Sequence, residues 1–148
     1  MNERISHFIA QHTCANICTL NENGTPYCFT CFFAYNSKEQ LLLFKSSTDT
    51  THSINILRNP VVAGTILPDK LNKMQIKGVQ FEGTILPFDH PLAKQAATDY
   101  YLKNPMAVDV PGEVWTVQLQ KLKYTDYTLG FGTKLHWVRE TTNEQLIK

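Results

Sequence analysis

The chain has 148 residues, of which 43% are hydrophobic and 18% charged, with 14 lysines and arginines against 13 aspartates and glutamates. This length fits one domain with a single core, and the near-neutral charge gives no electrostatic reason to expect nucleic acid or an anionic membrane as a partner. No stretch approaches the roughly 20 apolar residues that a membrane helix needs. We therefore expect one cytoplasmic domain at 1–140, followed by a C-terminal tail at 141–148.

The N-terminal part of the chain predicts one short helix and then a β-hairpin. Apolar side chains recur at helical spacing over 3–12, which predicts an amphipathic helix. Residues 14–20 are rich in small and β-branched side chains, and Asn-Glu-Asn-Gly at 21–24 supplies the asparagine and glycine of a tight turn. Residues 27–35 are then expected to return as the partner strand.

The next part of the chain predicts a helix between two strands. A strand is expected at 41–45, and the hydroxyl-rich run at 46–51 offers several helix N-caps. The Asn-Pro pair at 59–60 is typical of a helix end. A further strand is expected at 61–67.

The second half of the chain continues the same pattern. A long strand is expected at 75–86, with Gly78 and Gly83 where a barrel strand bends or bulges. His-Pro opens a helix over 90–105, and a last clear strand is expected at 114–124. In all, six strands with short connections and three peripheral helices predict a mainly β protein with a six-stranded antiparallel barrel, because closure removes exposed edges. An open α+β sheet is the alternative.

This order of elements resembles that of the FMN-binding split-barrel proteins related to pyridoxamine 5'-phosphate oxidase. The clearest local likeness lies at 44–60. In that family a strand ends in an aromatic-hydroxyl pair, and a helix that opens with Ser-Arg-Lys and closes with Asn-Pro surrounds the FMN phosphate. Counted back from the Asn-Pro pair, the opening positions fall on Thr50, Thr51 and His52. Ser46 takes the place of the family hydroxyl.

Two further segments carry the resemblance. Val-Gln-Phe-Glu-Gly at 79–83 is similar to the family's Val-Arg-Val-Glu-Gly strand. Phe-Gly at 131–132 with Lys-Leu-His at 134–136 looks like the family's C-terminal Trp-x-Gly and Arg-Leu-His, which come from the second subunit and close over the flavin. The ending at 123–132 is closer still to the bacterial YhbP-like proteins. For these the resemblance implies the same fold and a homodimer.

The resemblance implies an FMN-binding, oxidoreductase-like homodimer with an unspecified substrate, in which the cofactor performs the chemistry and no side chain need be catalytic. A helix N-terminus suits the phosphate because it presents free N–H groups and partial positive charge. The implied FMN contacts are the backbone of Thr30, Cys31, Phe32 and Phe33 and the side chain of Gln80 at the ring; Lys45, Ser46, Thr50, Thr51 and His52 at the phosphate; and Phe131 and Lys134 from the partner subunit.

Three positions depart from the family pattern. Thr51 and His52 stand where the family has arginine and lysine, and Thr30 stands near another family arginine, with Lys45 as the replacement cation. The alternative hypothesis is therefore a non-enzymatic dimeric split-barrel module that has lost the flavin and binds another small ligand. Without the family role, the hydroxyl-rich helix start is an ordinary capped helix.

Four cysteines with the spacing C-x3-C-x9-C-x2-C suggest a zinc hypothesis. Cys28 and Cys31 are expected on opposite faces of one strand, whereas zinc ligand pairs converge on a turn, so we expect buried free thiols and no metal site. Trp115, Phe131 and Trp137 either stack on a ring ligand or anchor the core and an interface. Neither a nucleophile elbow nor a phosphate-binding loop is present.

Overall fold

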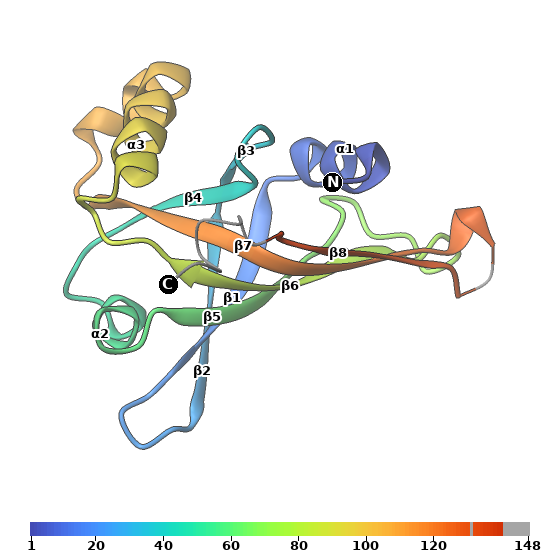
Figure 1. Cartoon of the computed structure of the whole chain (residues 1–148), viewed down its shortest axis with the longest axis horizontal. Helices are drawn as coiled ribbons and strands as arrows, with labels where there is room; N and C mark the ends of the chain where they lie inside the picture. Colours follow the sequence, from blue (N-terminus) through green and yellow to red (C-terminus); the bar gives the residue numbers. More distant parts are fainter. Residues whose placement is uncertain (131, 141–148) are drawn as a thin grey trace.

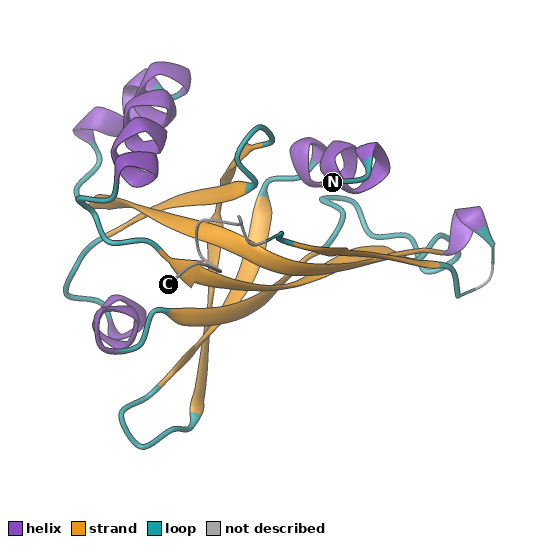
Figure 2. Cartoon of the chain, viewed as in Figure 1, coloured by secondary structure: helices purple, strands orange, loops and turns teal. Residues whose placement is uncertain are grey.

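The computed structural model describes residues 1–130 and 132–140. Three α-helices lie around a curled antiparallel sheet (Figures 1 and 2): α1 (Glu3–Gln11), α2 (Thr51–Arg58) and α3 (Pro91–Lys103). The strands are β1 (Cys14–Leu20), β2 (Pro26–Phe32), β3 (Ala34–Asn36), β4 (Leu41–Ser46), β5 (Val61–Ile66), β6 (Lys77–Ile85), β7 (Glu113–Asp126) and β8 (Lys134–Val138). Two 3-10 turns occupy Pro105–Asp109 and Tyr127–Leu129. Within the part of the chain that the structure describes, no helix is long and apolar enough to cross a bilayer.

The strand order is β2-β1-β5-β6-β7-β4-β3, and β8 pairs with β7 outside this path. Only Phe33 separates β2 from β3, although these strands stand at opposite ends of the order. The segment expected as one strand at 27–35 therefore pairs with β1 through its first part and with β4 through its second part. The sheet returns to itself through this segment, so the predicted mainly β split-barrel fold is confirmed. Strand β8 is an addition that the sequence did not predict.

One edge of β7 serves two partners. Strand β4 pairs with its first half and β8 with its second half. Arg139 fills the step between them: its Nε donates to the carbonyl of Leu119 at 2.7 Å, and a terminal nitrogen donates to the carbonyls of Glu39 and Gln40 at 2.9 and 3.1 Å. Arg139 therefore joins β7 to the residues just before β4 through three backbone carbonyls.

Two hydrophobic clusters hold the sheet and helices together. The larger cluster fills the concave side of the sheet, and α1 closes one end of it with Ile5, Phe8 and Ile9. The smaller cluster joins β4 and β7 to α3, through Leu41, Leu43, Val114, Ala93 and Ala96 among others. Strand β4 is buried on both faces because it takes part in both clusters.

Strand β6 has an irregularity at Gly83, one of the two glycines that the sequence singled out. Its register against β7 shifts between Glu82 and Gly83. A Cβ at Gly83 would lie 2.6 Å from Cγ1 of Val117 and 2.9 Å from the carbonyl oxygen of Gln118, so only glycine allows this approach. The predicted bulge is confirmed at this position.

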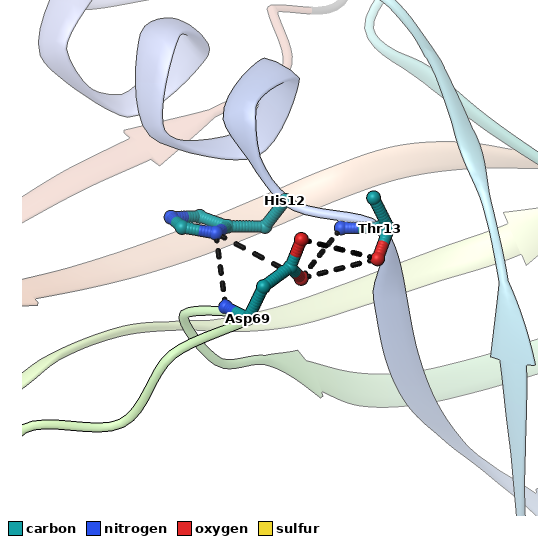
Figure 3. Close-up of polar contacts among 3 residues, drawn as sticks. All are labelled: His12, Thr13 and Asp69. Atoms are coloured by element: carbon teal, nitrogen blue, oxygen red, sulfur yellow. Dashed lines mark hydrogen bonds and ion pairs between the residues drawn. The ribbon is translucent and has the colours of Figure 1, made fainter.

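The loop between β5 and β6 is tied to the junction of α1 and β1 (Figure 3). The Asp69 carboxylate accepts from the N–H of Thr13 at 3.0 Å and from its hydroxyl at 3.1 Å. The Asp69 N–H donates to Nδ1 of His12 at 3.1 Å. Burial lowers the pKa of His12, the Asp69 carboxylate opposes this, and Lys77 adds to it. A neutral ring is the form that accepts from a backbone N–H.

Candidate functional site

Helix α2 begins within the hydroxyl-rich run at 46–51 that offered several N-caps. The Thr50 hydroxyl accepts from the N–H of Ser53 at 3.1 Å, which makes Thr50 the N-cap, and Asn59 ends the helix. Ser53 is buried, and its hydroxyl donates to the carbonyl of Ser47 at 2.6 Å. These bonds fix the first turn, at which the N–H groups of Thr51 and His52 have no acceptor within the helix.

The structure brings Ser46 and His52 together at this helix start. Oγ of Ser46 lies 2.7 Å from Nε2 of His52. The imidazole also stacks on the ring of Phe29, with centroids 3.8 Å apart and planes inclined by 8°. Burial lowers the pKa of His52, which favours the neutral ring. The pair therefore offers one hydroxyl and one neutral imidazole beside the open first turn of α2, where the N–H groups of Thr51 and His52 have no acceptor within the helix.

Lys45 does not join this group. Lys45 and Ser46 are successive residues of β4, so their side chains point to opposite faces. The Lys45 ammonium donates to the carbonyl of Ala107 and lies 4.9 Å from the ring centroid of Tyr101. This arrangement does not support the expected role of Lys45 as a cation beside the helix start.

A cavity of about 600 Å³ lies on the outer face of the sheet; we call it the outer cavity. It crosses five strands of the main sheet and β8, and Gln80 lies in it. Its lining residues are Asn16, Cys18, Cys28, Ala63, Gly64, Thr65, Gln80, Phe81, Glu82, Lys121, Leu122, Lys123, His136, Trp137 and Val138.

Six polar side chains form one transverse line over this face, which we call the polar row. Strand pairing sets each member directly opposite the next, in the order Thr30, Asn16, Thr65, Gln80, Lys123 and His136. All but Thr30 line the outer cavity. At the usual spacing between strands the row spans about 24 Å. It presents hydroxyl, amide, ammonium and imidazole groups along one line.

The outer cavity has a mixed charge. Lys121 and Glu82 form an exposed ion pair at 3.8 Å, while Lys123 and His136 belong to the polar row. At the other end of the row, Asn16 Nδ2 donates to Oγ1 of Thr30 at 3.4 Å. The cavity can therefore hydrogen-bond a polar ring system at many points, and lysine is the cation that it offers to an anionic group.

The remaining predicted contacts lie in β2, directly after it, and near the end of the chain. Thr30 and Phe32 lie on the outer face, and Phe32 is 79% exposed. Cys31 and Phe33 pack against the core instead, and burial raises the pKa of Cys31 to about 12. Lys134 is exposed on β8, where it lies opposite Thr125. Phe131 lies outside the described residues.

Sequence reasoning missed four members of the polar row: Asn16, Thr65, Lys123 and His136. Each occupies an outward position in a strand with alternating burial, and His136 also belongs to the Lys-Leu-His segment that resembles the family. Of the two candidate stacking tryptophans, Trp115 is a core residue at 1% exposure, and its Nε1 donates to the carbonyl of Ser46 at 3.0 Å. Trp137 borders the outer cavity, but its side chain packs against the larger core cluster.

Sequence comparison identifies the family. The family described as pyridoxamine 5'-phosphate oxidase matches residues 1–125. The chain belongs to this family. Among its relatives, a UPF0306 protein of Serratia proteamaculans is 33% identical over 137 residues, covering 93% of this chain and 94% of the relative. A UPF0306 protein YhbP of Salmonella paratyphi A is 30% identical over 141 residues, covering 95% of each chain. The predicted YhbP-like subgroup of the family is confirmed by these relatives.

Solved structures agree on the fold. The heme storage protein HutZ of Vibrio cholerae aligns with a TM-score of 0.61 at 16% identity, covering 97% of each chain. An FAD-binding protein of Mesorhizobium loti aligns with a TM-score of 0.60 at 16% identity, covering 82% of this chain and 91% of that one. At this identity the likeness establishes a common fold, which other members use for different ring-shaped ligands.

Proposed function

We propose that this member of the pyridoxamine 5'-phosphate oxidase family binds FMN as a homodimer and acts as a flavin-dependent oxidoreductase. The observation that carries the proposal is the polar row on the floor of the outer cavity. The cavity volume of about 600 Å³ lies within the range of roughly 300–1,000 Å³ that is usual for cofactor sites.

The residues fit the two ends of FMN differently. An isoalloxazine ring has carbonyl and N–H groups along one edge, and the amide of Gln80 and the hydroxyl of Thr65 can pair with both kinds. At the phosphate end, Ser46, His52 and the open turn of α2 supply hydrogen-bond donors. Lysine and arginine are not among the described side chains that contact Ser46 or His52. The donor set fits FMN, with a phosphate contact that depends on neutral donors.

Strand β2 connects the two ends. Phe29 contacts His52 on the inner side, and the next residue, Thr30, begins the polar row on the outer side. Strand β2 ends the sheet order, so its edge away from β1 has no partner strand among the described residues. A ligand that contacts both the Ser46–His52 pair and the polar row therefore passes over this free edge of β2.

Bound FMN would supply electron transfer to and from a substrate. The residues of this chain have three tasks around it. His52 and Ser46 hold the phosphate, Gln80 and Thr65 orient the ring, and the sheet excludes water from the face of the ring that lies on it. The class of substrate stays open, because no side chain need supply a catalytic group.

We propose the homodimer because the outer face of the sheet, next to the free edge of β2, is exposed in a single chain. Phe32 is 79% exposed next to the free edge of β2, and both a bare apolar side chain and an unpaired strand edge favour association. A second copy seated here would cover the outer cavity and bring its own residues to the ligand. We propose that Lys134 and Phe131 of the partner subunit are among them.

Titration of the purified protein with FMN, followed by absorbance and by quenching of flavin fluorescence, tests the proposal. Riboflavin, which lacks the phosphate, serves as the second ligand. His52→Ala is expected to weaken FMN binding about tenfold, the loss of one charge-assisted hydrogen bond, and to leave riboflavin binding unchanged. His7→Ala, at an exposed helix position, is the control. Failure of the wild-type protein to bind FMN at micromolar concentrations would refute the proposal.

The ring end has its own variant. Gln80→Ala is expected to weaken FMN and riboflavin equally, by about fivefold for one hydrogen bond. Gln95→Ala on α3, where Gln95 donates to the side chain of Asp99, makes the same chemical change at a residue that does not line the cavity. Equal affinities of the Gln80 and Gln95 variants for FMN would show that Gln80 does not contribute to the binding site.

The position of Lys45 favours a second candidate function. Because its ammonium is engaged by Ala107 and Tyr101, a non-enzymatic module that binds a different small ligand in the outer cavity fits the same structure. HutZ is a heme storage protein on this fold, and histidine, the residue type of His136, is a common heme ligand. Hemin titration of the wild-type and His136→Ala proteins distinguishes this function: tight hemin binding without flavin binding would support it.

A further inference from the structure

Cys18 and Cys28 are direct partners across the β1–β2 hairpin. Backbone bonds at both ends of the hairpin show which kind of partners they are. The N–H of Asn21 donates to the carbonyl of Thr25 at 2.8 Å, and the N–H of Phe33 donates to the carbonyl of Thr13 at 2.9 Å. In an antiparallel pair hydrogen-bonded positions alternate with open ones, and counting inward from either end makes Cys18 and Cys28 an open pair.

Open pairs bring side chains closest together. Their Cα atoms are typically about 4.5 Å apart, which lies within the range of about 4.4–6.8 Å that a disulfide spans. Both side chains belong to the outer face and line the outer cavity. Burial and the neighbouring Cys28 thiol raise the pKa of Cys18, in agreement with the direct cross-strand pairing of the two residues.

The other two cysteines lack this arrangement. Cys14 lies opposite Phe32, and Cys31 lies opposite Ala15 with its side chain packed against the core. Cys28 is the exposed cysteine, while the other three are partly buried. The hairpin therefore holds one matched thiol pair, with one member open to solvent.

We propose that Cys18 and Cys28 form a reversible dithiol–disulfide site in the wall of the outer cavity, which exchanges with low-molecular-weight disulfides. The thiolate of Cys28 attacks one sulfur of the small disulfide, whose S–S bond breaks and releases one thiol. The thiolate of Cys18 then attacks the mixed disulfide and displaces the second thiol. The protein loses two electrons and two protons, and the small disulfide becomes two thiols.

The order of the two steps follows from access. Cys28 is reached first because it is exposed, and Cys18 resolves the mixed disulfide because it lies directly opposite Cys28 on the neighbouring strand. The proposal does not depend on a flavin. It makes the wall of the outer cavity chemically different under oxidising and reducing conditions.

The test uses the full chain, reduced and then incubated with glutathione disulfide, quenched with iodoacetamide in denaturant, and weighed intact. The chain has four cysteines, so the reduced protein takes four labels and the oxidised protein is expected to take two. Cleavage after Glu22 leaves Cys14 with Cys18 in one peptide and Cys28 with Cys31 in the other, so fragmentation of the cross-linked pair identifies the bond by the labels on Cys14 and Cys31. The Cys14→Ser/Cys31→Ser double variant is expected to keep the disulfide.

Single variants test the order of attack. Cys18→Ala is expected to accumulate the glutathione adduct on Cys28, because the resolving thiol is missing. Cys28→Ala is expected to form at least tenfold less adduct over the same time. A cross-link between other cysteines, four labels after oxidation, or equal yields from protein unfolded in urea would overturn the proposal. Circular dichroism of each variant checks that the fold is retained.

Discussion

The imidazole of His52 lies flat on the ring of Phe29, and this contact joins the first turn of α2 to β2. Phe29 also packs on Phe44, with ring centroids 5.4 Å apart, which connects the contact to the core. The side chain that we assign to the phosphate is thus held by the strand that borders the ring site. Packing and ligand binding are coupled at this position.

Phe29→Leu tests that coupling. The variant removes the stacked partner of His52 and part of a core contact, and we expect it to lower the free energy of unfolding by about 1–3 kcal/mol. Urea denaturation measures the loss. Tyr27→Leu is the control, because Tyr27 is an aromatic residue on the same face of the same strand but is 38% exposed. We expect this variant to lower the free energy of unfolding by less than about 1 kcal/mol. Equal losses in the two variants would contradict the structural role of the stack.

Acidification is expected to destabilise the protein through His12 and His52. Burial lowers the pKa of both in the folded state from the ordinary value of 6.5. As the pH falls through 6.5, the unfolded chain therefore binds more protons than the folded one, and stability that is complete above about pH 7.5 is lost toward pH 5. Urea denaturation across this pH range measures the slope.

His12→Phe isolates one of the two contributions. Phenylalanine can keep the ring contact with Phe8, where the His12 ring centroid lies at 4.5 Å, but it neither titrates nor accepts from Asp69. We expect a protein that is less stable at pH 7.5 but has a shallower pH dependence. An unchanged slope would show that His12 is not responsible.

Gly83→Ala probes the bulge in β6. The added methyl group has to displace Val117 or the backbone of Gln118, and we expect a loss of about 1–3 kcal/mol, or about 2–10 °C in melting temperature. Gly78→Ala is the matched control in the same strand, because its Cβ would meet Leu67 and Ile66 at 3.4 and 3.5 Å, which is ordinary contact. Differential scanning calorimetry compares the two. A Gly78 variant as unstable as the Gly83 variant would argue against a special role for the bulge.

Phe32→Ser tests the homodimer. Removal of this exposed ring from the free edge region of β2 is expected to raise the dimer dissociation constant at least tenfold, measured by sedimentation velocity over a concentration series. Leu102→Ser on α3 removes an equally exposed side chain at 74% and is expected to leave association unchanged. A wild-type protein that sediments as a monomer at every concentration would refute the proposed dimer.

Local signals predicted the local features of the fold. The Asn-Gly turn appears where the sequence predicts it, the N-cap at Thr50 is one of several that the run at 46–51 offered, and the bulge at Gly83 is at one of the two glycines expected to bend the strand. The division of the 27–35 segment at Phe33 was not visible, because both of its parts alternate in the same way. Strand β8 is short and follows a glycine-rich turn, so its pairing with β7 depends on tertiary contact.

The candidate site was predictable only in part. Ser46 and His52 were found because a family pattern marks them, and their hydrogen bond agrees with a shared role. The polar row was missed because it depends on the register of six strands, which single-strand alternation does not give. Lys45 was misplaced for a simpler reason: as a neighbour of Ser46 in a strand, it had to face the other side.

The late position of β7 in the chain has a consequence for biosynthesis. One edge of β4 pairs with β3, but its other edge pairs with β7, as Leu41 does with Gln118, so one edge of the apolar segment at 41–44 has no partner strand until most of the protein has left the ribosome. Such long-range pairing slows folding and leaves time for aggregation. We expect soluble yield to rise when translation is slowed by cooling or when a holding chaperone is supplied.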